Sequence, residues 1–192
     1  SCTGRRLVGL QLPELHGPRA RGAGCADKED RVYVVGGTDG QRPVASVERL
    51  DTKALERSAS VVQSWETLPP IPTARRDCTA AVACAEGLLY VLGGYANGKV
   101  SGAVEMMHLS DGRWDELEML PVPCVEASAV SSNRAVYTFG GSRDSNALAE
   151  SHRLDPRVGF WDSLPPMPTA RYGCVATFLG ESCLGTRRAC VL

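Results

Sequence analysis

Residues 89–94 read Leu-Tyr-Val-Leu-Gly-Gly, a short apolar run that ends in two adjacent glycines. The same pattern occurs twice more, as Val-Tyr-Val-Val-Gly-Gly at residues 32–37 and as Val-Tyr-Thr-Phe-Gly-Gly at residues 136–141. The first glycines of successive copies are 57 and 47 residues apart, which indicates one repeated structural unit. The repeated positions are Tyr33, Tyr90 and Tyr137, with Gly36, Gly37, Gly93, Gly94, Gly140 and Gly141.

A tryptophan follows each glycine pair with nearly the same period. Trp65, Trp114 and Trp161 are 49 and 47 residues apart, and each is followed by a proline seven positions later. A large aromatic side chain is suited to packing one unit on the next, and its indole N–H needs a partner. A weaker upstream copy has Gly9 at the tryptophan position.

A period near 50 residues with Gly-Gly, a downstream tryptophan and a proline-rich link resembles the kelch repeat, whose unit is one four-stranded blade of a β-propeller. The resemblance runs from about residue 18 to residue 173. It implies an all-β, kelch-type β-propeller that is incomplete, with about three full four-stranded blades and partial blades at both ends. We expect a degraded repeat or linker at 1–17, repeats at 18–72, 73–121 and 122–168, and a truncated fourth repeat with a divergent tail at 169–192.

Closure of a propeller typically needs at least four blades. We therefore expect a fragment of a longer propeller, or a sequence with incorrect ends. Its exposed blade edges then favour self-association.

The repeats differ at several positions. Arg75 and Arg171 lie ten residues after a tryptophan, but Cys124 takes that place in between. Segment 52–64 is longer than its counterparts and predicts an enlarged outer loop. Glu48 and Glu105 occupy matching positions and are interpreted as structural carboxylates, not as a catalytic pair.

The composition indicates a globular chain without a marked charge excess. Hydrophobic residues make up 43%, charged residues 22%, and the net charge is −1. We expect no nucleic-acid partner, because there is no excess of basic residues, and no membrane span, because no apolar run is long enough. The absence of an Asn-x-Ser/Thr site favours a cytoplasmic location, with the nucleus as an alternative.

No catalytic or metal-binding pattern stands out. The eight cysteines lack paired or metal-ligand spacing and are interpreted as free thiols in core strands, so we expect no metal and no cofactor. The three histidines fall at unrelated repeat positions, and neither a nucleophile elbow nor a phosphate loop is present. We predict no enzyme activity; the alternative is a fragment of a kelch-like propeller enzyme of the copper oxidase or sugar epimerase type.

The resemblance also implies where a partner binds. In kelch propellers that recognise peptides, the pocket surrounds one mouth of the central channel. It is lined by the residue after each Gly-Gly pair and by the entrance of the following inner strand. The corresponding residues here are Thr38, Tyr95, Ser142, Arg76, Asp77, Arg171 and Tyr172. Arginine there would hold an acidic peptide segment and tyrosine would supply contact area.

For Arg75 and Arg171 the competing interpretation is an anchor that bonds carbonyls of the neighbouring blade. The resemblance as a whole implies a non-catalytic protein-interaction module. Both a substrate-recognition part of a cullin-based ubiquitin ligase and an actin-binding or scaffold propeller stay open. A copy without any partner is a third alternative.

Overall fold

The computed structural model describes residues 13–53, 64–83, 87–132, 135–179 and 188–191. Its strands form three four-stranded antiparallel sheets, which we call blades 1, 2 and 3. Within each blade the strands cross the sheet in chain order, so that each blade is a meander. This arrangement confirms the all-β, partial propeller that the repeats predict.

Blade 1 consists of β1 (Ala23–Ala26), β2 (Arg31–Val35), β3 (Val47–Asp51) and β4 (Glu66–Leu68). Blade 2 consists of β5 (Thr79–Ala83), β6 (Leu88–Leu92), β9 (Val104–His108) and β10 (Trp114–Leu117). Blade 3 consists of β11 (Ser128–Ser131), β12 (Val136–Phe139), β15 (Ser151–Asp155) and β16 (Phe160–Leu164). A further pair, β17 (Ala176–Leu179) and β18 (Arg188–Val191), forms a two-stranded sheet.

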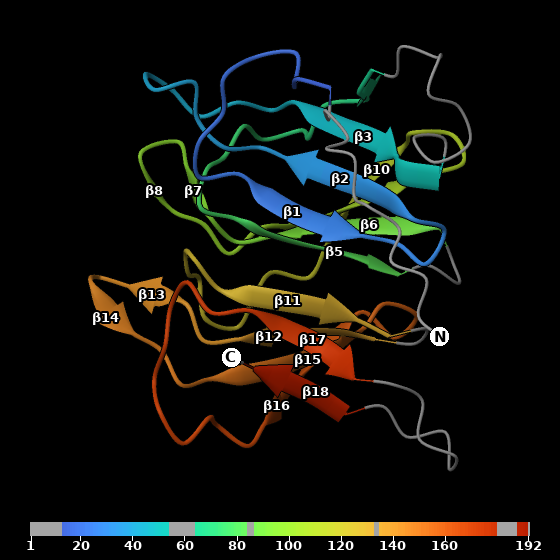
Figure 1. Ribbon diagram of the computed structural model, residues 1–192. Helices are drawn as coiled ribbons and strands as arrows, with labels where there is room; N and C mark the ends of the chain where they lie inside the picture. Colours follow the sequence, from blue (N-terminus) through green and yellow to red (C-terminus); the bar gives the residue numbers. More distant parts are fainter. Residues whose placement is uncertain (1–12, 54–63, 84–86, 133–134, 180–187, 192) are drawn as a thin grey trace, which may run out of the picture.

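The first strand of each sheet lies on the inside of the arc. Strand β5 packs beside β1 and β11, and β17 packs beside β11 (Figure 1). Two hairpins project from the blades: β7 (Tyr95–Ala96) with β8 (Lys99–Val100), and β13 (Ser142–Arg143) with β14 (Asn146–Ala147). Both hairpins lie at the left side of the molecule in Figure 1, so they mark the same end of the arc.

Apolar side chains fill the spaces between the blades. The core between blades 1 and 2 contains Tyr33 of β2 and Leu89 of β6, both fully buried. The core between blades 2 and 3 contains Tyr90 of β6 and Leu154 of β15. Neighbouring residues of β6 thus face opposite blades, which explains why this strand is apolar at every position.

The glycine pairs bring neighbouring blades into close contact. At Gly93 φ is +62°, and a Cβ atom there would lie 2.6 Å from the carbonyl oxygen of Cys124 in the next blade. The N–H of Gly94 donates to that oxygen at 2.9 Å. The corresponding contacts join Gly36–Gly37 to Arg75 and Gly140–Gly141 to Arg171. Only glycine combines this backbone conformation with this close approach.

Each tryptophan donates its indole N–H to a carbonyl of the preceding repeat. Trp114 Nε1 lies 3.2 Å from the oxygen of Pro69, and Trp161 Nε1 lies 3.0 Å from that of Glu118. Trp65 Nε1 lies 3.0 Å from the oxygen of Pro13. All three acceptors follow a tryptophan position by four residues, which shows that the degraded upstream repeat makes the same contact.

Replacing Trp114 with alanine is expected to lower the free energy of unfolding by about 2–3 kcal/mol, as for a half-buried aromatic at a core boundary. Trp114→Phe keeps most of the ring contact but loses the hydrogen bond to Pro69, so it should cost about 1 kcal/mol. Urea denaturation of the two variants measures both values. Equal stability of Trp114→Ala and the wild type would show that this side chain does not hold blades 1 and 2 together.

Two sequence expectations fall partly outside the described residues. The predicted enlarged loop at 52–64 is described only at its ends. The tail after residue 180 is described only for the backbone of β18. In the part of the chain that the structure describes, no helix has the length and apolar character needed to cross a membrane.

Candidate functional site at the mouth of the arc

A buried arginine fixes the base of the hairpin in blade 2. Arg75 is fully buried, which is rare for arginine unless it is paired. Its Nη1 donates to the carbonyl oxygens of Gly93 and Ala103, both at 3.1 Å, and its Nη2 forms a 2.7 Å ion pair with Glu105. These two carbonyls flank the segment that carries hairpin β7–β8. The prediction that the Arg75 side chain bonds carbonyls of the neighbouring blade is therefore wrong. The side chain instead joins two carbonyls of its own blade, an arrangement that we call the clamp.

Blade 1 repeats this clamp. Arg19 Nη1 donates to the carbonyl oxygens of Val34 and Ser46 at 3.3 and 3.4 Å, and its Nη2 contacts the Glu48 carboxylate. Glu48 is 2% exposed and also accepts a 2.9 Å hydrogen bond from the backbone N–H of His16. The two matching glutamates are thus parts of buried ion pairs, in agreement with their interpretation as structural carboxylates. Burial raises the pKa of Glu105, and the charge of Arg75 opposes that rise.

A chain of backbone hydrogen bonds links the inner strands at the hairpin end, which we call the mouth. Arg21, Asp77, Glu126 and Gly173 occupy the same repeat position and have φ values of 57, 56, 54 and 61°. The N–H of each residue after the first donates to the carbonyl oxygen of its predecessor at 2.8 Å. Left-handed backbone is costly for residues other than glycine, so the three charged residues are held there by their surroundings.

The charged side chains next to these backbone hydrogen bonds form ion pairs with one another. Arg21 Nε lies 2.6 Å from Asp77 Oδ1, and its Nη2 lies 3.7 Å from Glu126 Oε1. Arg76 Nη1 lies 2.9 Å from Asp77 Oδ2. Arg76 joins this group through its pair with Asp77. Arg21, Asp77 and Glu126 line a cavity of about 290 Å³. Its lining also includes Gly22, Cys78, Ala127, Gly173 and Cys174.

The residue after each glycine pair forms a bridge to the strand entrance of its own blade. Thr38 pairs with Ala20, Tyr95 with Arg76, and Ser142 with Val125. The structure therefore places the three predicted residues of this group at the mouth, one in each blade. We call each bridged pair the corner of its blade. Of the three bridge partners, only Arg76 was among the predicted binding residues.

The corner of blade 2 is the one with strong side-chain interactions. The guanidinium carbon of Arg76 lies 4.6 Å from the centre of the Tyr95 ring, a distance typical of a cation–π contact. The Tyr95 hydroxyl donates to the carbonyl oxygen of Gly98 at 2.8 Å. Three of the predicted binding residues, Arg76, Asp77 and Tyr95, thus form one contiguous group.

Arg171 and Tyr172 lie at the entrance to β17. The backbone N–H of Arg171 donates to the carbonyl oxygen of Leu148 at 2.9 Å, and its carbonyl accepts from Gly141. The Tyr172 side chain is 58% exposed. The backbone of Arg171 is therefore held by two hydrogen bonds, and both residues present their side chains to solvent.

Comparison with known proteins finds similarity over most of the chain. Residues 11–184 match the family model described as the KLHDC2/KLHL20/DRC7 Kelch-repeats domain. The chain belongs to the kelch-repeat family. This kelch domain is 28% identical over 152 residues to mouse (Mus musculus) Kelch-like protein 35, covering 78% of this chain and 24% of that protein. It is 26% identical over 160 residues to human (Homo sapiens) Kelch-like protein 33, covering 78% of this chain and 30% of that protein.

A viral protein is similar to this chain as well. Kelch repeat and BTB domain-containing protein 1 of cowpox virus (strain Brighton Red) is 29% identical over 151 residues, covering 77% of this chain and 24% of the viral protein. The kelch domain thus spans about a quarter to a third of the length of the curated relatives that it matches. Kelch-like proteins are typically protein-binding adaptors.

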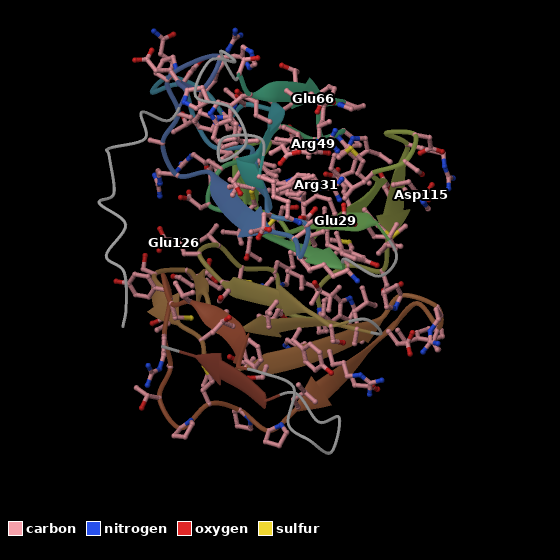
Figure 2. All side chains as sticks on the ribbon, turned by 45° about the vertical axis from the view of Figure 1, so that its right-hand side comes forward. Glu29, Arg31, Arg49, Glu66, Asp115 and Glu126 are labelled. Carbon is pink, nitrogen blue, oxygen red and sulfur yellow. The ribbon has the colours of Figure 1, made fainter. Side chains whose placement is uncertain are left out.

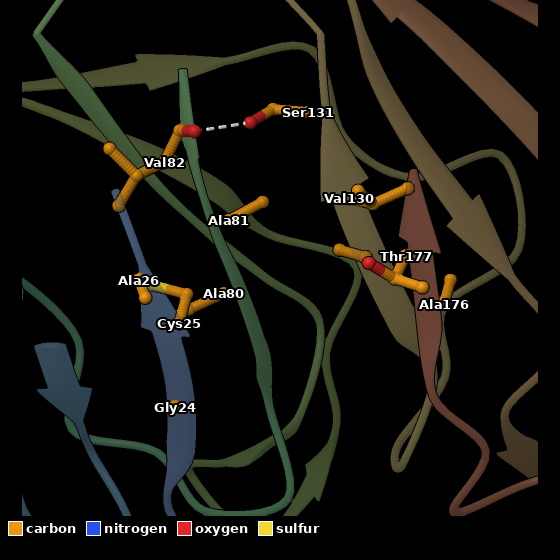
Figure 3. Close-up of a pocket in the computed structure, with 11 residues that line it drawn as sticks. Gly24, Cys25, Ala26, Ala80, Ala81, Val82, Val130, Ser131, Ala176 and Thr177 are labelled. Atoms are coloured by element: carbon orange, nitrogen blue, oxygen red, sulfur yellow. Dashed lines mark hydrogen bonds between the residues drawn. The ribbon is translucent and has the colours of Figure 1, made fainter. Parts of the chain in front are cut away.

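Small residues line the centre of the arc in the kelch domain. A cavity of about 390 Å³ lies among β1, β5, β11 and β17, as Figure 3 shows. Its labelled lining includes Gly24, Ala80, Ala81 and Ala176, and the Ser131 hydroxyl donates to the carbonyl oxygen of Val82 at 2.5 Å. This central space lacks the convergent charged groups of the mouth in the part of the chain that the structure describes.

Cys78, Cys124 and Cys174 of the kelch domain are free thiols. Burial raises the pKa of Cys78, which lines the mouth cavity, to about 11, and it raises the pKa of Cys124 to about 11 as well. Both thiols are therefore protonated at neutral pH, and a thiol is a far weaker nucleophile than a thiolate. Neither Cys78 nor Cys124 is therefore an activated nucleophile.

Several ion pairs lie far from the mouth. Arg31 pairs with Glu29 at 2.7 Å and Arg49 with Glu66 at 2.6 Å, both on blade 1. Figure 2 shows these four residues well separated from Glu126. Partly exposed pairs of this kind usually contribute little to stability.

Sequence reasoning missed Glu126 and gave Arg21 too little weight. The available signal was positional, because both lie two residues after the position that Arg75 and Cys124 occupy in their repeats. Their left-handed backbone and their mutual ion pair become visible only in the structure.

Proposed function

We propose that this kelch domain is a non-catalytic interaction module that binds a short segment of a partner protein at the mouth. The observation that carries the proposal is the cavity of about 290 Å³ at which charged residues of three blades converge, with the Arg76–Tyr95 corner beside it. Arginine and tyrosine are the residues that most often dominate protein interfaces. The left-handed residues that rim the cavity add support, because such backbone outliers cluster at functional sites.

The chemistry of the corner favours an acidic position in the bound segment. Arg76 uses Nη1 for Asp77 and is stacked on Tyr95, so its guanidinium is held in one orientation. Its remaining N–H donors make no hydrogen bond to the described residues and offer a carboxylate a charge-assisted contact. The exposed Arg171 and Tyr172, at the entrance to β17, supply a second contact region.

Within this proposal, substrate recognition in a cullin-based ubiquitin ligase is favoured over actin binding or scaffolding. One supporting observation is that the cowpox relative is named for a BTB domain beside its kelch repeats. A propeller enzyme of the copper oxidase or sugar epimerase type has no specific observation in its favour.

Selection from a random peptide display library tests the proposed binding. The wild-type domain should enrich a consensus, and the double variant Arg76→Ala with Tyr172→Ala should bind the enriched peptides at least about ten-fold more weakly. Its free energy of unfolding should stay within about 1 kcal/mol of the wild type, as for other surface substitutions.

The matched control is Arg157→Ala with Phe160→Ala. Both side chains are exposed and lie at the β15–β16 turn, at the end of blade 3 that points away from the mouth. This control should select the same consensus with the same affinity. Failure of the wild type to enrich any consensus, or equal binding by the Arg76/Tyr172 variant, would refute the proposed function.

A further inference from the structure

The arginine–glutamate clamp of blades 1 and 2 is missing from blade 3. The positions of Arg75 and Glu105 are taken there by Cys124 and His152, and β12 pairs with His152 in the register in which β6 pairs with Glu105. Both members of the ion pair are thus replaced together. A single replacement would have left a buried charge without its partner, which is costly.

The two replacements are uncharged and do not reproduce the clamp. His152 is 8% exposed, and neither ring nitrogen has a hydrogen-bond partner among the described residues. Burial lowers the pKa of His152, although the Glu150 carboxylate opposes this, so the ring is neutral at neutral pH. The Cys124 side chain is short and carries one weak donor, whereas arginine bridges two carbonyls. The base of the blade 3 segment between Gly140 and Glu150 therefore lacks the side-chain bridge that joins Gly93 to Ala103.

The turn of the blade 3 hairpin is also less favourable. Hairpin β7–β8 turns through Asn97 and Gly98, with φ values of 50 and 79°. Hairpin β13–β14 turns through Asp144 and Ser145, with φ values of 50 and 65°. A two-residue turn with positive φ at both positions prefers Asn-Gly or Asp-Gly, so Ser145 stands where glycine fits without strain.

A third difference lies at the corner position. In blade 2, Tyr95 stacks on Arg76 and its hydroxyl bonds the turn at Gly98. In blade 3 the corresponding residues are Ser142 and Val125, which share only the backbone bridge. Three independent features thus stabilise hairpin β7–β8 and are missing from hairpin β13–β14.

We propose that hairpin β13–β14 is the adjustable wall of the mouth and hairpin β7–β8 is its fixed wall. Regions with fewer supporting contacts open locally at a lower free-energy cost than the rest of a fold. The fixed wall orients Arg76 and Tyr95, while the adjustable wall fits itself to the bound segment. The purpose of this arrangement rests on the proposed function, but the difference between the two hairpins is a property of the free protein.

Amide hydrogen exchange followed by NMR on the free protein tests the inference. Two amides in each hairpin segment make matched hydrogen bonds: Tyr95 and Ser101 donate to Arg76 and Gly94, and Ser142 and Leu148 donate to Val125 and Gly141. The Ser142 and Leu148 amides should exchange at least about ten-fold faster than the Tyr95 and Ser101 amides, after correction for intrinsic rates.

Two variants connect the exchange to its causes. Ser145→Gly, on the exposed turn, should slow exchange at Ser142 and Leu148 by about five-fold and leave Tyr95 and Ser101 unchanged. Cys124→Arg combined with His152→Glu installs the clamp and should slow the same two amides, whereas each single substitution should destabilise the domain. The turn variant keeps the test decisive if the buried double variant does not fold.

Equal exchange in the two hairpins, or no response to Ser145→Gly, would overturn the inference. This outcome leaves the proposed function untouched, because peptide selection at the mouth is measured separately. Conversely, a selection that enriches no peptide refutes the binding proposal. The difference between the hairpins is still decided by the exchange rates alone. With an enriched peptide bound, protection should increase more at Ser142 and Leu148 than at Tyr95 and Ser101.

Discussion

Replacing Arg75 with methionine is expected to lower the free energy of unfolding by about 3–5 kcal/mol. The substitution leaves Glu105, which is 2% exposed, without its cation, and leaves the carbonyls of Gly93 and Ala103 without their donor. Methionine is an unbranched apolar side chain of similar volume, so the loss mainly reports the charge and the hydrogen bonds. Chemical denaturation measures the effect.

Two controls define the origin of this loss. The double variant Arg75→Met with Glu105→Leu removes both charges and should recover a large part of the stability, since buried ion pairs are often replaceable by apolar residues. Arg49→Met removes an arginine whose ion pair with Glu66 is partly exposed, and it should cost about 1 kcal/mol or less. A loss at Arg49 as large as that at Arg75 would contradict the special role of the buried clamp.

The stability of Arg75→Met should also depend on pH. Burial raises the pKa of Glu105 in the folded protein, and removal of Arg75 takes away the charge that opposes this rise. A carboxyl with a raised folded pKa stabilises the fold below its unfolded pKa, and this contribution is lost as pH rises through the folded value. The deficit of the variant relative to the wild type should therefore be smaller at about pH 4 than at about pH 7.

Gly93→Ala is expected to lower the free energy of unfolding by about 3–4 kcal/mol. The new Cβ atom would lie 2.6 Å from the backbone oxygen of Cys124, and a backbone atom cannot swing aside as a flexible side chain does. Blades 2 and 3 would have to move apart, which also weakens the hydrogen bond from the Gly94 N–H to that oxygen.

Gly87→Ala provides a matched control for this prediction. Gly87 has the same φ of +62°, but a Cβ atom there meets nothing within 4 Å. Alanine at this site should cost about 1 kcal/mol, the strain of the left-handed backbone alone. The difference between the two variants measures the contact between blades, and equal losses would show that the glycine pair serves only a local turn.

The fold could be predicted because each element repeats. The copies of Tyr-x-x-Gly-Gly and the tryptophans each carry a physical requirement, and several matching copies make chance agreement improbable. The hydrogen bond from the Trp65 indole to Pro13 shows that the residue spacing was sufficient to identify even the weak upstream copy.

The mouth could be located, but its pairings could not be predicted. The residues after the glycine pairs lie at its corners as expected, because their place follows from the repeat. The Arg21–Asp77–Glu126 pairing depends on left-handed backbone and on the rotation between blades, which no local pattern encodes. From the sequence, Arg75 is interpreted as an anchor to the neighbouring blade. In the structure it bonds carbonyls of its own blade, which depends on the length and direction of the side chain in three dimensions.

Binding at the mouth is tested most directly by an NMR chemical-shift map of the domain with a peptide enriched by selection. Binding at the mouth should perturb amides in residues 20–22, 76–77, 95–100, 126, 142–147 and 171–172, with the largest changes near Arg76 and Tyr95. Perturbations confined to the outer strands β4, β10 and β16, with the mouth unchanged, would contradict it.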